Sequence, residues 1–351
     1  MNLKIAKLAG DGIGPEVITE AVKVCNAVAK KFNHKITWND GLIGADAIDK
    51  VGDPYPQKTH EICLESDAIL FGAIGDPKYD NNPNAKIRPE QGLLSMRKKL
   101  GLYANIRPTF TFDSLIENSP LKKEIIRGTN LIFVRELTGG IYFGKKGRNN
   151  KNMSAYDTCN YSKDEIVRLA KIGFNLASKR SKKLCCVDKA NVMETSRLWR
   201  ETIQSMEKDY PKIEVSYEFV DAVAMRLIQW PKNYDVLITE NLFGDILTDE
   251  ASVISGSMGL MPSASIGEKT SLYEPIHGSY PEATGKNIAN PLATILSAAM
   301  MFENSFNLKE EAQLIKDSVI DSLDKKIVTS DISKNKSYTT SYVGDWITSK
   351  I

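Results

Sequence analysis

The chain has 351 residues and a nearly balanced charge, with 46 lysines and arginines against 44 aspartates and glutamates. This balance predicts no nucleic-acid or membrane partner, and the length suffices for a large core divided between two domains. The longest apolar run, residues 291–302, is too short to span a bilayer and predicts a buried helix. The five cysteines include no C-x-x-C pair, which indicates reduced thiols in a cytoplasmic protein.

Strand-like and helix-like segments alternate along most of the chain. Such alternation predicts an α/β protein with a mostly parallel sheet. A polar stretch at 144–157 predicts a projecting hairpin or loop. The predicted strands are residues 4–9, 68–74, 130–137, 183–189 and 213–220, and the predicted helices include 16–32, 163–180, 191–208 and 221–230.

The glycine-rich segment GDGIGPE at residues 10–16 follows the first predicted strand. Its spacing is G-x-G-x-G rather than G-x-G-x-x-G, and no clear acidic strand end follows, so it does not predict a Rossmann turn. The glycines instead predict a tight strand-to-helix turn whose backbone can approach a ligand. Pro15 is expected to be the first residue of the helix, where its missing N–H has no consequence.

Two aspartates, Asp245 and Asp249, lie four residues apart where a helix is expected to follow the apolar run NYDVLIT. One interpretation is a solvated helix start that tolerates roughly 0.2–0.5 kcal/mol of repulsion. The other is a site for Mg²⁺ or Mn²⁺, hard cations that prefer oxygen ligands. Asp221 ends the strand 213–220 and is either a helix N-cap or a further functional carboxylate.

Several basic and hydroxyl side chains also accompany turns or strand ends. Arg97, Arg107 and Arg135 suit a small polyacid, because arginine binds carboxylates with two hydrogen bonds, although each alone is more often a surface ion-pair partner. Tyr142 lies in the glycine-flanked turn TGGIYFG and can donate a proton if it is exposed there. Lys189 follows a strand end, where α/β sites gather, or is an ordinary solvated lysine.

The segment LYEPIHGSYPEATGKNIANP at 272–291 contains a loop long enough to wrap a ligand. His277 within it is either structural or a ligand contact. Asn290 and Pro291 are expected to be the N-cap and the first residue of the following helix.

Six segments occur in a fixed order: GDGIGPE, an E-x-x-L-L-x-x-R block, TGGIYFG, VDKANVM, ENLFGDILTDEAS, and EPIHGS with GKNIANP. Together they resemble the β-decarboxylating dehydrogenases, the family of the isocitrate and isopropylmalate dehydrogenases. The resemblance extends over roughly residues 10 to 300, nearly the whole chain.

This resemblance implies a two-lobed fold with one continuous mixed sheet, which is not a Rossmann fold. Residues 1–102 and 255–351 would form the cofactor-binding lobe. Residues 103–254 would form the lobe for dimerisation, substrate and metal. An arm near residues 140–160 would help to build a homodimer.

The resemblance also implies the cofactors NAD and Mg²⁺ or Mn²⁺ and a role for each matching residue. Tyr142 would be the catalytic acid and Lys189 the base, with Lys189 and Asp221 reaching into the partner's site. The metal ligands would be Asp221, Asp245 and Asp249. Substrate would be bound by Arg97, Arg107, Arg135, Asp221, Glu90, Leu93, Leu94 and Val192. The cofactor would be bound by His277, Gly278, Ser279, Tyr280, Pro281, Glu282 and Asn290.

The side chains near the expected C3 substituent indicate the substrate. Leu93, Leu94 and Val192 would form an apolar pocket for isopropyl, and Glu90 would repel the third carboxylate of isocitrate. The expected reaction is the NAD-dependent oxidative decarboxylation of (2R,3S)-3-isopropylmalate to 4-methyl-2-oxopentanoate in leucine biosynthesis. The alternatives are isocitrate, homoisocitrate, tartrate or D-malate as substrate, and a pair of leucines that merely forms the core face of a helix.

The cofactor loop departs from the family pattern at Tyr280, where a small residue is usual, and at Glu282, where aspartate is usual. A carboxylate at Glu282 can accept hydrogen bonds from ribose hydroxyls and repels a 2′-phosphate, which predicts NAD rather than NADP. A non-catalytic regulatory subunit is disfavoured, because Tyr142, Lys189 and the three aspartates are all present. A simple phosphate-binding module would leave five of the six segments unexplained.

Overall fold

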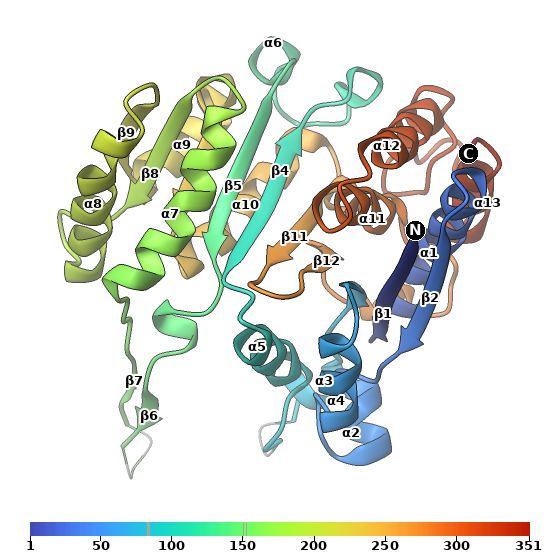
Figure 1. The fold of residues 1–351 in the computed structure, drawn as a ribbon, viewed down its shortest axis with the longest axis horizontal. Coiled ribbons are helices and arrows are strands. Elements are labelled where there is room, and N and C mark those ends of the chain that lie inside the picture. Colours follow the sequence, from blue (N-terminus) through green and yellow to red (C-terminus); the bar gives the residue numbers. More distant parts are fainter. Residues whose placement is uncertain (83–84, 150, 152) are drawn as a thin grey trace. The chain divides into compact units, whose positions relative to one another are not determined.

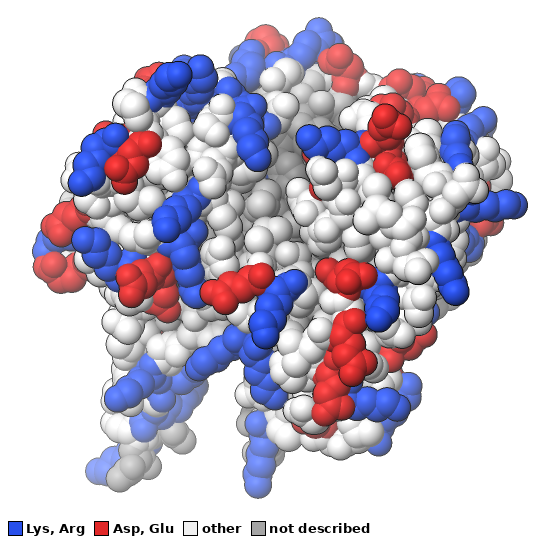
Figure 2. Space-filling model, in the orientation of Figure 1, with Lys and Arg blue, Asp and Glu red and all other residues white. Residues whose placement is uncertain are grey.

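The computed structural model describes residues 1–82, 85–149, 151 and 153–351 (Figure 1). The described chain forms two compact units. Unit 1 comprises residues 1–102, 112–118 and 255–351, and unit 2 comprises residues 103–111 and 119–254. Each unit combines helices with parallel and antiparallel strands, which confirms the α/β class. Acidic and basic side chains are interspersed on the visible face of each unit, in keeping with the small net charge (Figure 2).

The described strands of unit 1 run in the order β2-β1-β3-β12-β11. Strand β1 is parallel to β2 and β3, β12 is parallel to β3, and β11 is antiparallel to β12. Every residue of β3 is buried, as expected for an apolar strand covered on both faces. The bounds are β1 (Asn2–Gly10), β2 (Lys35–Asp40), β3 (Ala68–Ala73), β11 (Pro262–Ile266) and β12 (Leu272–Pro275).

The helices of unit 1 include α11 (Leu292–Asn304), which arises from the apolar run predicted to be a buried helix. Its residues 292–302 are all buried, which confirms that prediction. None of the helices in the described part of the chain is both long enough and apolar enough to cross a membrane. The others are α1 (Gly14–Lys31), α2 (Ala45–Val51), α3 (Gln57–Leu64), α4 (Pro77–Asp80), α5 (Pro89–Leu100), α12 (Lys309–Asp324) and α13 (Thr340–Thr348), with short 3₁₀ turns η1 (Asp113–Leu115), η5 (Met258–Leu260) and η6 (Pro281–Ala283).

The main sheet of unit 2 has its described strands in the order β4-β5-β10-β8-β9. Strand β4 (Ala104–Phe110) is antiparallel to β5 (Asn130–Glu136). Strands β5, β10 (Val236–Thr239), β8 (Lys183–Asp188) and β9 (Glu214–Phe219) are parallel. The carboxyl ends of these four strands therefore meet at one edge of the sheet, where ligands of open α/β sheets commonly bind.

The helices of unit 2 lie close to the predicted positions. Helix α7 (Lys163–Ser178) begins with a capping box in which the backbone N–H of Ser162 donates to the Glu165 carboxylate at 2.7 Å. Helix α9 (Val220–Gln229) ends before Pro231, as predicted. The remaining described elements are α6 (Lys123–Ile126), α8 (Glu194–Met206), α10 (Asn241–Ser255), η2 (Gly140–Tyr142), η3 (Glu207–Asp209) and η4 (Pro231–Asn233).

The hairpin predicted at 144–157 is present as an antiparallel pair, β6 (Lys146–Arg148) with β7 (Ala155–Asp157). It extends away from the main sheet of unit 2 (Figure 1), and all three residues of β7 are exposed. Residues 150 and 152 of this segment lie outside the described residues. Its function as a dimerisation arm stays a prediction.

Three helix starts differ by one or two residues from the sequence-based expectation. Helix α1 begins at Gly14, so Pro15 is its second residue rather than its first. Helix α11 begins at Leu292 with Pro291 at the cap, although the side chain of Asn290 still accepts the Leu292 N–H at 3.0 Å. Asp221 lies inside the first turn of α9 and is therefore not its N-cap. Shifts of this size are ordinary at frayed helix ends.

Candidate active site

The carboxyl edge of the unit 2 sheet brings together four of the predicted site residues. Arg107 comes from β4, Arg135 from the end of β5, Tyr142 from η2 and Asp245 from α10. One Asp245 oxygen accepts a hydrogen bond from Arg135 Nη1, and the other accepts the Tyr142 hydroxyl at 2.7 Å. The Arg135 guanidinium also lies 5.9 Å from the centre of the Tyr142 ring. A cation, a phenol and a carboxylate thus share one contact network.

Both arginines of this network are buried rather than on the surface, with relative exposures of 6% for Arg107 and 2% for Arg135. Arg107 Nη1 donates to the Thr248 hydroxyl and lies 3.9 Å from Asp245 and 4.0 Å from Asp249. The alternative of a solvated surface ion pair is therefore wrong for these two arginines. Buried guanidinium groups at a sheet edge are suited to binding the carboxylates of a small acid.

Burial and neighbouring charges shift the pKa values of the cluster residues in different directions. Burial alone would raise the pKa of Asp245, but Arg135, Tyr142 and Arg107 outweigh it and hold that pKa below its usual value. Burial and the neighbouring Asp245 charge raise the pKa of Asp249. Burial and the hydrogen bond to Asp245 raise the pKa of Tyr142 to about 12. At neutral pH Tyr142 therefore holds its proton while Asp245 is ionised.

The same helix face offers two oxygen ligands to a hard cation. Asp245 and Asp249 are one turn apart on α10, and the Asp249 side chain is 59% exposed. Within the described part of this chain, no three His, Cys, Asp or Glu side chains gather closely enough to hold a metal ion. Carboxylate oxygens are the ligands that Mg²⁺ and Mn²⁺ prefer, and the role of these two aspartates as metal ligands stays a prediction.

The third predicted ligand, Asp221, follows β9, three strands away from the β5 strand that carries Arg135. Lys189 follows β8 and Asp221 follows β9, and Lys189 Nζ donates to Asp221 Oδ1 at 2.6 Å. This hydrogen bond lowers the pKa of Asp221. Val192 lies next to the pair, donates its N–H to the Lys189 carbonyl at 3.0 Å and is 66% exposed. Asp221 and Val192 face solvent in the single chain, whereas the Lys189 side chain is only 26% exposed.

Helix α5 of unit 1 carries the predicted substrate residues Glu90, Leu93, Leu94 and Arg97. Arg97 is buried and its Nη2 lies 3.1 Å from the carboxylate of Glu274, so a surface ion pair is excluded here also. Its Nε is buried and has no hydrogen-bond partner among the residues that the structure describes. Leu93 and Leu94 are both half-buried. Leu93 packs against a core cluster, which supports the core-face alternative for this leucine.

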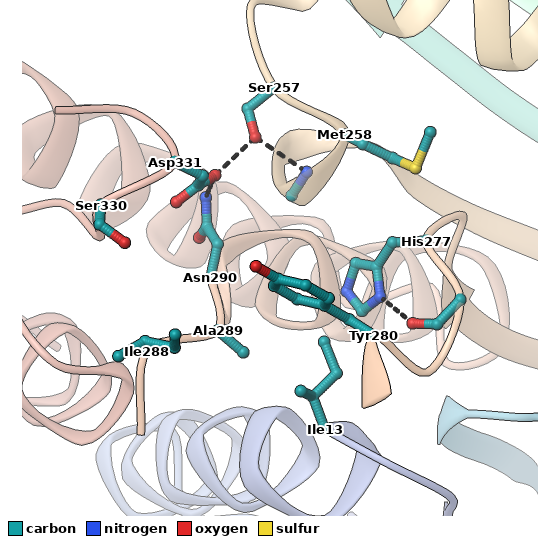
Figure 3. Close-up of a pocket in the computed structure, with 12 residues that line it drawn as sticks. Ile13, Ser257, Met258, His277, Tyr280, Ile288, Ala289, Asn290, Ser330 and Asp331 are labelled. Atoms are coloured by element: carbon teal, nitrogen blue, oxygen red, sulfur yellow. Dashed lines mark hydrogen bonds between the residues drawn. The ribbon is translucent and has the colours of Figure 1, made fainter. Parts of the chain in front are cut away.

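A cavity of about 490 Å³ in unit 1 includes part of the predicted cofactor loop (Figure 3). Of the predicted cofactor residues, His277, Gly278, Tyr280 and Asn290 line it, and Ser279, Pro281 and Glu282 do not. The lining residues that sequence reasoning missed are Ile13, Ser257, Met258, Gly259, Ile288, Ala289, Ser330 and Asp331.

Hydrogen bonds fix the polar side of this cavity. One Asp331 oxygen accepts the Ser257 hydroxyl at 2.6 Å and the Asn290 amide at 3.0 Å (Figure 3). His277 Nδ1 donates to the Gly278 carbonyl at 3.0 Å, and its Nε2 is buried without a partner. Burial lowers the pKa of His277, so the ring is neutral and Nε2 is an acceptor. The cavity thus combines an apolar wall with one fixed carboxylate.

The GDGIGPE turn contributes Ile13 to the wall of this cavity. The N–H of Ile13 donates to the Ser279 carbonyl at 2.9 Å. Gly12 adopts a φ of +58°, and a Cβ there would lie 2.1 Å from the same carbonyl oxygen. The glycine therefore permits a close backbone approach to the cofactor loop and places Ile13 in the cavity wall. The GDGIGPE motif could have indicated Ile13, because the motif predicts a backbone close to a ligand. Asp331, in contrast, lies in a tail without any diagnostic motif.

The chain matches the family model described as isocitrate/isopropylmalate dehydrogenase over residues 4–347. Among curated relatives, a 3-isopropylmalate dehydrogenase of Bacteroides fragilis is 56% identical over 99% of this chain and 98% of its own length. A protein of the same name from Aquifex aeolicus is 50% identical over 94% of this chain and 91% of its own. Among solved structures, isocitrate dehydrogenase from Methylococcus capsulatus superposes with a TM-score of 0.90 at 31% identity, covering 99% of both chains. The β-decarboxylating dehydrogenase of Thermococcus kodakarensis gives 0.80 at 32% identity, covering 99% of this chain and 96% of its own.

Proposed function

The chain belongs to the isocitrate/isopropylmalate dehydrogenase family, and we propose that it converts (2R,3S)-3-isopropylmalate and NAD⁺ to 4-methyl-2-oxopentanoate, CO₂ and NADH in leucine biosynthesis. The observation that carries the proposal is the network of Arg107, Arg135, Tyr142 and Asp245 in one sheet edge. It combines carboxylate binding, a protonated acid and a metal-ligand carboxylate. A relative that is 56% identical to this chain is named 3-isopropylmalate dehydrogenase.

Arg107 and Arg135 bind carboxylate groups of the substrate through their guanidinium groups. Both guanidinium groups are buried before substrate binds. Substrate carboxylates therefore replace hydrogen-bonding partners within the protein rather than bulk water. Binding of the carboxylates would orient the C2–H bond for hydride transfer and leave the C2 hydroxyl accessible to a base.

Asp245 and Asp249, with Asp221 of the partner subunit, would hold Mg²⁺ or Mn²⁺, which supplies Lewis-acid polarisation of the C2 oxygen in both half-reactions. Lys189 accepts the C2 hydroxyl proton as hydride leaves for NAD⁺. The C–C bond to the β-carboxylate then breaks and releases CO₂. Tyr142, which holds its proton at neutral pH, then delivers a proton to C3.

The unit 1 cavity would hold the adenosine part of the cofactor. Its apolar wall suits the base, and His277 and Asn290 offer polar contacts. The Asp331 carboxylate adds a fixed negative charge that disfavours a 2′-phosphate, and Glu282, on the same loop as His277 but outside the cavity lining, adds another. Both charges support NAD as the cofactor in preference to NADP.

Exposed apolar residues of unit 2 support the proposal of a homodimer with shared sites. Met225 on α9 and Ile246 on α10 are 52% and 58% exposed, and Trp230 is 53% exposed. Large apolar side chains in such positions favour burial against a second copy. Lys189 and Asp221, which stand apart from Arg135 within one chain, would then complete the partner's site.

The proposal is tested by NADH absorbance with purified protein, NAD⁺, Mg²⁺ and a panel of 2-hydroxy diacids. We expect a kcat/KM for 3-isopropylmalate at least about a hundredfold above that for isocitrate, because burying an unpaired carboxylate beside leucine is unfavourable. The Leu94→Ala variant should lose part of this preference. Leu93→Ala is the matched comparison, because Leu93 packs on the core. Equal oxidation of isocitrate would overturn the substrate assignment.

Shared sites are tested by mixing two inactive variants, Lys189→Met and Tyr142→Phe. If Lys189 serves the partner's site, a mixed dimer contains one site with both native residues and regains activity. Tagged subunits would establish that exchange has occurred. Activity that stays at background in exchanged dimers would place Lys189 and Tyr142 in the same chain's site.

A further inference from the structure

Asn241, the first residue of α10, contacts both the substrate-binding arginine and the turn that carries the acid. Its side-chain oxygen accepts from Arg135 Nη2 at 2.8 Å and from Arg135 Nε at 3.2 Å. Its side-chain nitrogen donates to the Gly139 carbonyl at 3.2 Å. We propose that Asn241 is a positioning residue that holds Arg135 and Tyr142 in one fixed relation. This inference rests on the proposed function for the meaning of that relation.

The Arg135 side of this contact leaves the guanidinium little freedom to rotate. Besides the side-chain contacts, Arg135 Nε donates to the backbone carbonyl of Asn241 at 2.9 Å, and Nη1 donates to Asp245. Gly244 permits this approach, since a Cβ there would lie 2.6 Å from Arg135 Cγ. Because the group is planar, contacts on three of its nitrogens define the direction in which it meets a substrate carboxylate.

The Tyr142 side depends on the turn that begins at Gly139. The N–H of Gly139 donates to the buried Glu136 carboxylate at 2.7 Å, and its carbonyl accepts from Asn241. Gly140 follows with a φ of +74°, and a Cβ there would lie 2.1 Å from the Tyr161 hydroxyl. The 3₁₀ turn Gly140–Tyr142 starts directly from this clamped peptide. The location of the Tyr142 hydroxyl therefore depends on the donor of Asn241.

Only an amide satisfies both contacts at once. Asn241 is 1% exposed, and its backbone N–H donates to the Tyr161 hydroxyl at 2.9 Å, so the residue itself is held in place. Arg135 requires an acceptor and the Gly139 carbonyl requires a donor. An aspartate supplies the first and not the second, whereas an alanine supplies neither. These two substitutions separate the two contacts.

The kinetic test compares Asn241→Asp and Asn241→Ala with the intact enzyme. Asn241→Asp should lower kcat roughly tenfold or more, with KM for 3-isopropylmalate within about threefold, because a carboxylate repels the Gly139 carbonyl but still accepts from Arg135. Asn241→Ala should lower kcat and also raise KM roughly tenfold. In Asn241→Asp the deuterium isotope effect from C2-labelled substrate should shrink, because proton delivery becomes slower than hydride transfer.

The matched control is Ser196→Ala, which removes a buried hydrogen bond of 3.2 Å to Glu240, the residue before Asn241. Ser196 contacts neither Arg135 nor the 139–142 turn in any described hydrogen bond, so this variant should lower Tm while kcat and KM stay within about twofold. Kinetic constants of the Asn241 variants that merely match this control would overturn the positioning role. A rise in KM without a fall in kcat for Asn241→Asp would overturn its link to Tyr142.

A second readout separates this inference from the proposed function. The Nη2–H resonance of Arg135, assigned by its loss in Arg135→Lys, should exchange slowly with water in the intact protein and in Ser196→Ala, because Nη2 donates to the Asn241 side chain at 2.8 Å. In Asn241→Ala it should exchange roughly tenfold faster or more. If this holds while 3-isopropylmalate is not oxidised, the positioning stands and the proposed function fails. Equal protection of the Arg135 guanidinium from hydrogen exchange in all variants would overturn the positioning role, whether or not 3-isopropylmalate is the substrate.

Discussion

The two proposed binding regions are built in opposite ways. The unit 2 cluster consists of buried charges that neutralise one another, with Arg107 and Arg135 against Asp245 and a phenol between them. The unit 1 cavity has an apolar wall and one carboxylate held by neutral donors. The region assigned to chemistry therefore depends on the direction of a few charges, whereas the region assigned to the cofactor depends on shape. Substitutions should consequently have larger effects in unit 2 than in unit 1.

The largest effect is expected for Tyr142→Phe, which removes the proton that the cluster holds. Loss of a positioned general acid lowers kcat by roughly 10²- to 10⁴-fold. The matched control is Tyr79→Phe, which removes an exposed hydroxyl bonded to Asp49 in unit 1. Steady-state kinetics of the two variants checks this expectation. Retention of the intact rate in Tyr142→Phe would remove Tyr142 from the mechanism.

A charge-conserving change in the same cluster tests whether direction matters as well as charge. Arg135→Lys keeps the positive charge but loses the planar group that contacts Asn241 and Asp245. We expect kcat/KM to fall roughly a hundredfold. Arg180→Lys is the control, since Arg180 makes comparable contacts with Asp235 and Asn130 away from the cluster. Similar kcat/KM values for both variants would show that charge alone suffices.

The buried charges of unit 2 should also make stability depend on pH. Burial raises the pKa of Glu240 to about 7 from its ordinary 4.5, so the folded state binds this proton more tightly than the unfolded state. The stabilisation is complete below pH 4.5 and is lost as pH rises through 7. From pH 5.5 to pH 8, the free energy of unfolding should fall by about 2 kcal/mol more in the intact protein than in Glu240→Gln. Urea unfolding at fixed protein concentration measures this difference, and parallel pH curves would contradict it.

The smallest effect is expected in the cofactor cavity. Asp331→Asn keeps the shape of the side chain and removes its charge, so the ratio of kcat/KM for NAD to that for NADP should fall roughly tenfold with kcat for NAD unchanged. Asp345→Asn, which alters an exposed partner of Lys23 in the same unit, is the control. A fall in kcat as large as that of Tyr142→Phe would break the contrast between the two regions.

The same contrast explains which features were predictable from the sequence. The strands at residues 68–73, 130–136 and 183–188 follow from local apolar runs, and α7 follows from its 3.6-residue period and capping residues. Arg135, Tyr142 and Asp245 stood out because each motif contains a chemically distinctive residue. Their convergence on one network required the pairing of strands from distant segments, which no local pattern specifies.

The parts that sequence reasoning missed depend on neutral or long-range contacts. Asp331 reaches Asn290 across 41 positions of sequence and has no motif around it. Glu282 was assigned to the cofactor by its place in the loop, yet it does not line the cavity. Tyr280, two residues before Glu282, lines the cavity and adopts a φ of +41°, so neighbouring residues of this loop do not all face the cavity. Asn241 was part of a quoted motif, but its contacts become visible only in three dimensions.

The most direct test of the proposed reaction is a product balance with 3-isopropylmalate, NAD⁺ and Mg²⁺. NADH absorbance, trapped CO₂ and the 2-oxo acid are measured in one reaction mixture that is run to completion. The arrangement of Arg135, Tyr142 and Asp245 predicts one NADH, one CO₂ and one 4-methyl-2-oxopentanoate for each 3-isopropylmalate consumed. NADH formed without CO₂, or no NADH at all, would contradict the assignment of this cluster to oxidative decarboxylation of that substrate.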